Sequence, residues 1–211
     1  MTKKERMKIL VVSYLPKLQA SRTKQLLNAF VQEVRDRDQL EYVDLLKDVP
    51  DFVTAEILDA YITRNYMGQL LSPEQKKAIA TFDKMTKQFK SADIVVMAFP
   101  MYNFTIPAAI KAYFDSVMLK GQTFDLGEKG FVGLMEGKKA LVLFSSGGAY
   151  TGKNEQYDYV TGLVKLEFGF MGFSDVRVIS AQGVDISTND VPKIIAIAQQ
   201  RVKKVVKDWS L

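Results

Sequence analysis

Apolar and polar positions along this chain alternate between two periods. Segments rich in apolar residues, each typical of a strand, lie at residues 8–13, 40–45, 93–99, 138–145 and 175–181, and those at 8–13 and 93–99 contain uninterrupted apolar runs. Between these runs, apolar residues recur at helical spacing, at about 26–34, 52–67, 73–90, 107–119, 156–171 and from about 189 to 209. Strands separated by helices predict an α/β fold with one parallel sheet that is covered by helices on both faces.

The residues between these elements support the same organisation. Ser72 followed by Pro73 is a strong helix start, since serine caps a helix and proline suits its first turn. The glycine-rich stretch 121–137 is predicted to be a long loop, a feature that is often functional. No repeat, linker or low-complexity stretch interrupts the pattern, so residues 1–211 are expected to form a single domain. The five strands suit a three-layer sandwich with strand order 2-1-3-4-5.

The most informative loop joins the third strand to the helix that follows. Two prolines bracket a short aromatic segment, whose residues of interest are Pro100, Met101, Tyr102, Asn103 and Phe104. Proline fixes φ, which holds the remaining backbone amides in one orientation. Ligands bind at the carboxyl edge of parallel sheets, and rigid amides beside aromatic rings suit a flat ligand such as a flavin. An ordinary tight turn has the same spacing, so both interpretations stay open at this point.

Two further loops at the same edge have ligand-binding character. After the first strand, Ser21, Arg22 and Thr23 begin a helix, where hydroxyls, free amides and positive charge suit a phosphate; simple capping by Ser21 is the alternative. After the fourth strand comes a glycine-paired loop, Ser145-Ser146-Gly147-Gly148. Paired glycines let the backbone approach a ligand closely, although they also form plain turns. The first, third and fourth strands are neighbours in the predicted order, so the three loops are expected to meet.

Composition excludes several kinds of chemistry. The chain has no cysteine and no histidine, which excludes disulfides, thiolate nucleophiles, iron–sulfur clusters and histidine-ligated metals. The usual general base near neutral pH is also missing, so an enzyme of this composition is expected to rely on a bound cofactor. The net charge of +5 is scattered, without the basic stripe that indicates nucleic-acid binding.

Several other classes of protein are also disfavoured. No apolar run approaches the roughly 20 residues that span a bilayer. Residues 1–6 are charged and lack a small-residue cleavage site, so we expect a cytoplasmic protein without a membrane partner. A Rossmann dehydrogenase is disfavoured because the sequence contains no Gly-x-Gly-x-x-Gly fingerprint, and the Walker phosphate loop is absent as well.

The motifs at the predicted edge resemble those of the FMN-dependent NADH azoreductases, also described as quinone reductases, in the flavodoxin-like superfamily. The resemblance rests on Pro-Met-Tyr-Asn-Phe-Thr-Ile-Pro at 100–107 and Ser-Ser-Gly-Gly at 145–148. Supporting stretches lie at 121–124, 137–140, 172–176 and 181–183, and the resemblance covers the chain after about Lys8. Ser146 departs from the family pattern, which often has arginine or asparagine there, and the phosphate loop departs at Pro16 and Lys17.

This resemblance implies a cofactor and a reaction. One FMN is expected per chain, with its phosphate at Ser21, Arg22 and Thr23 and its ring at loops 100–104 and 145–148. NADH or NADPH then supplies a hydride, and the reduced flavin passes two electrons to a quinone or an aromatic azo compound in a ping-pong mechanism. No catalytic side chain and no metal are implied, because the flavin carries the chemistry.

The resemblance also implies a homodimer in which each site is formed partly by the partner chain. Apolar residues of segment 52–67 are candidates for that contact. Phe124, Phe131 and Phe168 are expected to line the space above the flavin, from one chain or the other, because a planar acceptor stacks well on phenyl rings. Two alternatives stay open: a flavodoxin-type electron carrier that reduces no substrate of its own, and a cofactor-free interaction domain.

Overall fold

The central sheet has five parallel strands. The computed structural model describes residues 7–17, 21–34 and 39–211. Its main strands are β1 (Lys8–Ser13), β2 (Gln39–Asp44), β3 (Ile94–Pro100), β6 (Lys139–Ser146) and β7 (Asp175–Gln182). They pair in the order β2-β1-β3-β6-β7, and every neighbouring pair is parallel. The five predicted strands and their parallel arrangement are confirmed.

Two short strands between β3 and β6 were not predicted. Strands β4 (Phe124–Gly127) and β5 (Gly130–Gly133) form an antiparallel hairpin outside the main sheet. The prediction of a loop throughout 121–137 is therefore wrong for these residues. Numbered along the chain, the sheet order is 2-1-3-6-7 rather than 2-1-3-4-5, because the hairpin strands precede β6; the five long strands keep their predicted neighbours.

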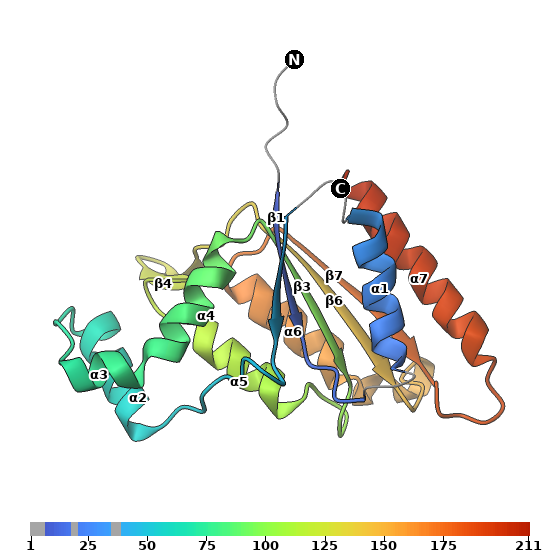
Figure 1. Cartoon of the computed structure of the whole chain (residues 1–211), viewed down its shortest axis with the longest axis horizontal. Coiled ribbons are helices and arrows are strands. Elements are labelled where there is room, and N and C mark those ends of the chain that lie inside the picture. Colours follow the sequence, from blue (N-terminus) through green and yellow to red (C-terminus); the bar gives the residue numbers. More distant parts are fainter. Residues whose placement is uncertain (1–6, 18–20, 35–38) are drawn as a thin grey trace, which may run out of the picture.

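Helices cover both faces of the sheet (Figure 1). Helices α1 (Arg22–Val34) and α7 (Val191–Asp208) pack on one face, where Ile9 and Val11 of β1 point. Helices α4 (Ala80–Ser91), α5 (Ala108–Val117) and α6 (Tyr159–Phe170) cover the other face, toward which Leu10 and Val12 point. The alternation of side chains along one strand thus divides the apolar core into two layers, as the predicted sandwich requires.

The segment between β2 and β3 extends to one side of the sandwich (Figure 1). It contains α2 (Ala55–Tyr61), a π-helix (Ile62–Tyr66) and α3 (Pro73–Ala78). Ser72 forms the predicted cap of α3 as part of a reciprocal capping box with Gln75. The predicted helix 73–90 is divided at Ile79, whose backbone leaves the helical region with φ −93° and ψ 3°. In the same way, residues 152–157 form a separate 3₁₀ turn before α6.

The hairpin is attached to the sandwich at a close backbone contact. A Cβ atom on Gly133 would lie 2.3 Å from the amide nitrogen of Gly172, which itself has φ +90°. Only glycine therefore allows β5 to lie against the turn that follows α6. This contact holds the hairpin phenylalanines in position.

Gly133→Ala is expected to lower the free energy of unfolding by about 1–3 kcal/mol, because backbone atoms must separate to admit the methyl group. Urea denaturation measures the change. Gly162→Ala is the matched control: this α6 glycine has open space at its Cβ, and the same substitution should stabilise the helix by about 1 kcal/mol. Equal effects of the two substitutions would show that the Gly133 contact is not tight.

Candidate active site at the carboxyl edge

Loops from four strands surround a cavity of about 210 Å³ at the carboxyl edge of the sheet. Its lining residues are Leu15, Pro16, Lys17, Ser21, Arg22, Thr23, Pro100, Met101, Tyr102, Ser145, Ser146, Gly147, Val184 and Asp185. Nine of the twelve residues predicted to bind a cofactor are in this set. The three predicted loops meet in one place, as expected from the strand order.

The first loop ends at the amino terminus of α1. The Ser21 hydroxyl accepts a hydrogen bond from the Lys24 amide at 3.2 Å, so Ser21 is the helix cap. Thr23 is buried, and its Oγ1 lies 2.7 Å from the Oγ of Ser145 on β6. The half-buried Arg22 and the exposed Lys17 add positive charge to the cavity wall. Positive charge beside free helix amides makes this end of the cavity suited to an anion.

The loop after β3 is a tight turn with an unusual backbone. Met101 extends the sheet ladder by donating from its amide to the Ser145 carbonyl at 2.8 Å. Tyr102 and Thr105 then exchange two backbone hydrogen bonds, each of 3.0 Å. The two residues between them, Asn103 and Phe104, have φ angles of 47° and 71°. Consecutive positive φ angles are the geometry of a type I′ turn, which fixes the direction in which these residues leave the sheet.

The glycine loop is held by its own serine and by the loop that follows β7. Ser146 is buried and donates from its hydroxyl to the Gly148 carbonyl at 2.9 Å. The amides of Val184 and Asp185 donate to the carbonyls of Ser146 and Gly147, each at 3.2 Å. Sequence reasoning missed Val184 and Asp185 as cavity residues. Their position in the sequence could have indicated them, because they follow β7, the fifth strand of the predicted sheet, and so lie at the same carboxyl edge.

The remaining predicted cofactor residues lie beside the cavity rather than in its wall. Asn103 and Phe104 continue the loop beyond Tyr102, and Gly148 continues the loop beyond Gly147. The Phe104 ring lies 5.9 Å from that of Tyr150 and 6.0 Å from that of Tyr157. The Tyr150 hydroxyl is 3.0 Å from the point that a Cβ on Gly148 would occupy. An aromatic rim thus borders the cavity.

The three phenylalanines predicted to line the substrate space have different positions. Phe124 and Phe131 face each other across the hairpin, and both pack against Phe170 of α6. Phe168 is fully buried among core rings, 4.8 Å from Phe173 and 5.4 Å from Phe114 between centroids. The prediction for Phe168 is therefore wrong, since a core side chain lines no open space. None of these rings belongs to the cavity wall of the same described chain.

A larger apolar hollow of about 400 Å³ lies between α2, α5, α6 and the hairpin. Phe124, Phe170 and Tyr61 are among its lining residues, and Glu167 stands in the same wall near Lys111. Glu167 is only 8% exposed, and this burial raises the pKa of its carboxyl group, an effect that Lys111 partly offsets. An ionised carboxylate in this apolar wall lowers the folding stability of the isolated chain, because it must lose part of its hydration.

Glu167→Gln is expected to raise the free energy of unfolding at pH 8 by about 1 kcal/mol, because no buried charge must then be desolvated. The raised pKa means that the folded state binds a proton more readily than the unfolded state. The contribution of Glu167 to stability is therefore most favourable below its unfolded pKa and is lost as pH rises through its folded pKa, so the benefit of the substitution should vanish below about pH 4. Urea denaturation at both pH values measures it, with exposed Glu155→Gln as control. A benefit independent of pH would contradict this explanation.

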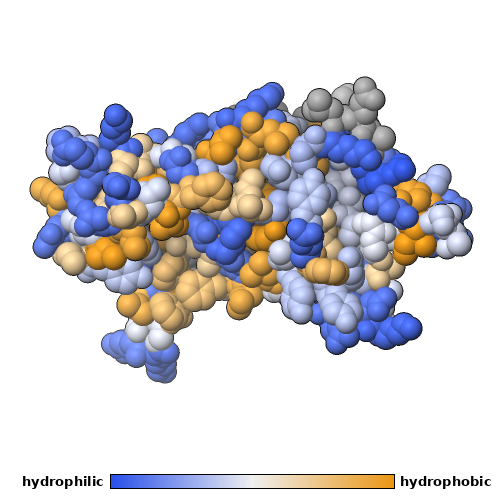
Figure 2. Space-filling model, turned by 90° about the horizontal axis from the view of Figure 1, so that it is seen from below, coloured by the Kyte–Doolittle hydropathy of each residue, from blue (hydrophilic) through white to orange (hydrophobic). Residues whose placement is uncertain are grey.

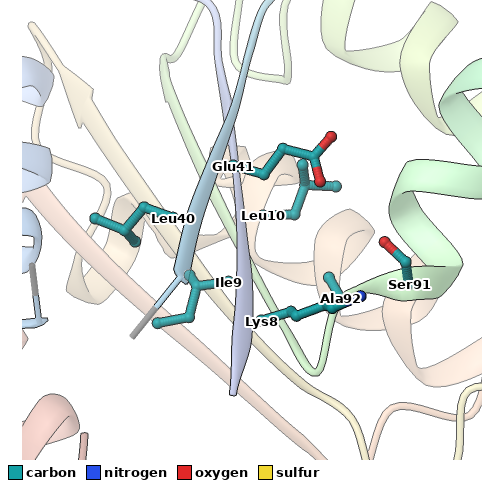
Figure 3. A pocket seen from close by; sticks show the side chains of 7 residues that line it. All are labelled: Lys8, Ile9, Leu10, Leu40, Glu41, Ser91 and Ala92. Carbon is teal, nitrogen blue, oxygen red and sulfur yellow. The ribbon is translucent and has the colours of Figure 1, made fainter. Parts of the chain in front are cut away.

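A third hollow, of about 360 Å³, lies at the opposite, amino edge of the sheet (Figure 3). Its residues come from the beginnings of β1 and β2 and from the end of α4. Two of its polar side chains are already engaged, since Glu41 accepts from Gln88 and Ser91 donates to the Gln88 carbonyl. Despite its greater volume and the cation Lys8 in its wall, this hollow lacks the helix amino terminus and the glycine loop of the carboxyl-edge cavity.

Two further observations concern metal binding and membrane spanning by the described residues. In the part of the chain that the structure describes, no three acidic side chains are grouped so as to hold a metal ion. No helix among the same residues combines the length and apolar character needed to cross a membrane.

A parallel five-stranded sheet of this order, with a cavity at its carboxyl edge, defines the flavodoxin-like class of α/β proteins. The chain belongs to the family described as having a flavodoxin-like fold, whose model matches residues 7–206. The resemblance inferred from the motifs is thereby confirmed for the flavodoxin-like superfamily, and the relatives that follow confirm it for the quinone reductase and azoreductase family.

Individual relatives carry more specific names. An FMN-dependent NADH:quinone oxidoreductase of Azospirillum brasilense is 34% identical over 201 residues, which cover 93% of this chain and 96% of that protein. A protein of the same name from Coprothermobacter proteolyticus is 34% identical over 207 residues, covering 96% and 99%. Among solved structures, an FMN-dependent NADH-azoreductase of Bacillus anthracis in complex with FMN has a TM-score of 0.87 and 28% identity, covering 97% of this chain and 100% of that one.

Proposed function

We propose that this chain is a single FMN-binding domain that uses NADH or NADPH to reduce quinones and aromatic azo compounds. The observation that carries the proposal is the meeting of three loops, each with a different chemical character, in one cavity at the carboxyl edge. The names of the relatives described above support the same activity. Each alignment covers nearly all of this chain and of the relative, so the proposal applies to the whole described fold.

The donor set of the cavity fits FMN. Arg22, Lys17 and the amino terminus of α1 suit the phosphate, with Ser21 as an additional hydroxyl. The loops 100–104 and 145–148 offer backbone amides and a flat aromatic rim that suit the ring system. FMN, when bound, supplies hydride acceptance from the nicotinamide and two-electron donation to the acceptor. The chain itself binds and orients the reactants, and water supplies protons because no histidine is present.

The site of one chain alone encloses too little space for a small organic ligand. Its cavity of about 210 Å³ is smaller than the roughly 300–1,000 Å³ typical of ligand pockets. Large apolar side chains are also exposed on the hairpin and before α2: Phe131 is 63% exposed, Leu126 is 53% exposed and Phe52 is 69% exposed. Figure 2, which views the molecule from below, shows hydrophobic residues gathered near the centre and toward the lower left, between more hydrophilic ends.

A homodimer accounts for both observations. In this proposal the apolar face formed by segment 52–70 and the hairpin packs against a second copy, so that the ring group of Phe124, Phe131 and Phe170 covers the partner's cavity. Contiguous exposed apolar surface of this kind marks interaction sites. The planar acceptor would then stack between the flavin and rings of the other chain.

The test of the proposed function is a titration of the purified chain with FMN, followed by steady-state assays. We expect one FMN per chain with a flavin absorbance spectrum, and NADH oxidation that depends on both FMN and a small quinone. Initial rates should give parallel double-reciprocal lines, because donor and acceptor use one space in turn. FMN binding without catalytic NADH oxidation would indicate an electron carrier instead, and absence of FMN binding would overturn the proposal.

A further inference from the structure

The wall of the carboxyl-edge cavity contains one acidic side chain, whereas its other ionised side chains are basic. Asp185 lines the cavity together with the cations Lys17 and Arg22. It belongs to the loop after β7, and its backbone amide donates to the Gly147 carbonyl at 3.2 Å. Anionic cofactors are ordinarily repelled by such a group, so its presence in a proposed FMN site needs a reason.

The Asp185 side chain is folded onto the glycine loop. Its Oδ2 atom lies 2.5 Å from the position that a Cβ on Gly147 would occupy. The absence of a side chain on Gly147 therefore leaves room for the carboxylate beside this loop. Within the described part of the chain, the carboxylate accepts no hydrogen bond and forms no ion pair within 4.0 Å. Its charge is consequently not neutralised by a neighbour and acts on whatever the cavity holds.

We propose that Asp185 tunes the reduction potential of the flavin at this site, making the reduced form a stronger electron donor. The inference rests on the proposed function, because it requires FMN in the cavity. Hydride transfer from NADH oxidises it to NAD⁺ and adds one negative charge to the bound cofactor. A fixed negative charge nearby opposes that addition more than it opposes binding of the oxidised cofactor. Asp185 is thus a positioning and tuning residue that lowers the potential, and it takes no part in bond making.

The opposing cations explain how the site tolerates this carboxylate. Ser21, Arg22 and Lys17 belong to the loop after β1, whereas Asp185 belongs to the loop after β7, at the far edge of the sheet. The positive side chains of the cavity wall therefore follow β1, whereas its negative side chain follows β7. A ligand with one phosphate is favoured with its anionic end toward α1, and additional negative charge toward the glycine loop is disfavoured. The same arrangement of charges that orients the cofactor therefore weakens the binding of its reduced form relative to its oxidised form.

The test compares the potential of bound FMN in the wild type and in charge variants. Potentials are measured anaerobically against a reference dye, and the FMN dissociation constant of the oxidised form is measured by fluorescence. Asp185→Asn should raise the affinity for reduced relative to oxidised FMN about fivefold, which for a two-electron couple is a rise of about 20 mV. Asp185→Ser should do the same, whereas Asp185→Glu, which keeps the charge, should stay near the wild type.

Two controls make the result specific. Glu136→Gln removes the same charge in the exposed turn before β6, at the amino edge of the sheet, and should leave the potential unchanged. Raising the salt concentration should shrink the difference between Asp185→Asn and the wild type, because mobile ions screen the charge. Bound FMN with an equal potential in all variants at low salt would overturn the role of Asp185 alone. Failure of the wild type to bind FMN would overturn the proposed function as well.

Discussion

Replacing Ser21 and Thr23 together by alanine is expected to raise the FMN dissociation constant more than tenfold, or by at least about 1.4 kcal/mol. The Ser21 hydroxyl stands at the amino terminus of α1, and hydrogen bonds to a charged phosphate are worth roughly 1.5–3 kcal/mol each. The Thr23 hydroxyl lies 2.7 Å from that of Ser145 and ties the first loop to the glycine loop. Its loss should loosen both walls of the cavity. Fluorescence titration of the apoprotein with FMN measures the effect.

Because Ser21 also caps α1, a control must separate lost capping from lost phosphate binding. Thr54→Ala removes an equivalent cap from α2, where the Thr54 hydroxyl accepts from the Ile57 amide at 3.3 Å. It should cost about 1 kcal/mol of stability without changing the affinity for FMN. Thr23→Ser, which keeps the hydroxyl, should bind FMN nearly as well as the wild type. A folded double variant with unchanged affinity would place the phosphate elsewhere.

Placing aspartate at both Leu126 and Phe131 should convert the homodimer into a monomer and reduce turnover with quinones at least tenfold. These two side chains are cross-strand partners in the hairpin and are 53% and 63% exposed. In the proposed dimer both become buried, and an unpaired carboxylate buried in an apolar interface costs several kcal/mol. Light scattering should then give a mass near 23.8 kDa instead of twice that value.

The matched control introduces the same charge on the other side of the molecule. Ile197 of α7 is 50% exposed, and Ile197→Asp should leave both the dimer and turnover intact. The affinity of the double hairpin variant for FMN should fall less than its turnover, since its own phosphate loop is unchanged. A wild-type chain that is already monomeric at micromolar concentration, yet fully active, would contradict the shared site.

The parts of the fold that could be predicted from the sequence are those with long, buried patterns. The central strands β1, β3 and β6 contain continuous apolar runs because both of their faces are covered, and such runs are recognisable without knowledge of their partners. The hairpin strands have four residues each, include glycine and are largely exposed, so they carry no comparable signal. The break at Ile79 was hidden because no glycine or proline marks it between Pro73 and Ser91.

The candidate site also combines residues that the sequence pattern indicates with residues that it does not. The loops that follow β1, β3 and β6 were identifiable from proline, glycine and hydroxyl residues, whereas Val184 and Asp185 lack such composition and are indicated only by their place after β7. The error at Phe168 was avoidable: Val160, Val164 and Phe168 recur every four residues and form the buried stripe of α6. Phe170, two residues on, leaves that stripe and packs on the hairpin instead. Which rings a second copy would contribute depends on the arrangement of two chains, which the pattern of one chain does not encode.

The left-handed turn at Asn103 and Phe104 has a consequence for the thermodynamics of ligand binding. A side chain in this backbone region carries a strain of about 1 kcal/mol or more, and the fold overcomes it through the two hydrogen bonds between Tyr102 and Thr105. The entropy of ordering this loop is therefore lost when the chain folds and not when a ligand arrives. Folding stability is lower by that amount, and the association rate is governed by diffusion and the release of water rather than by a search among loop conformations.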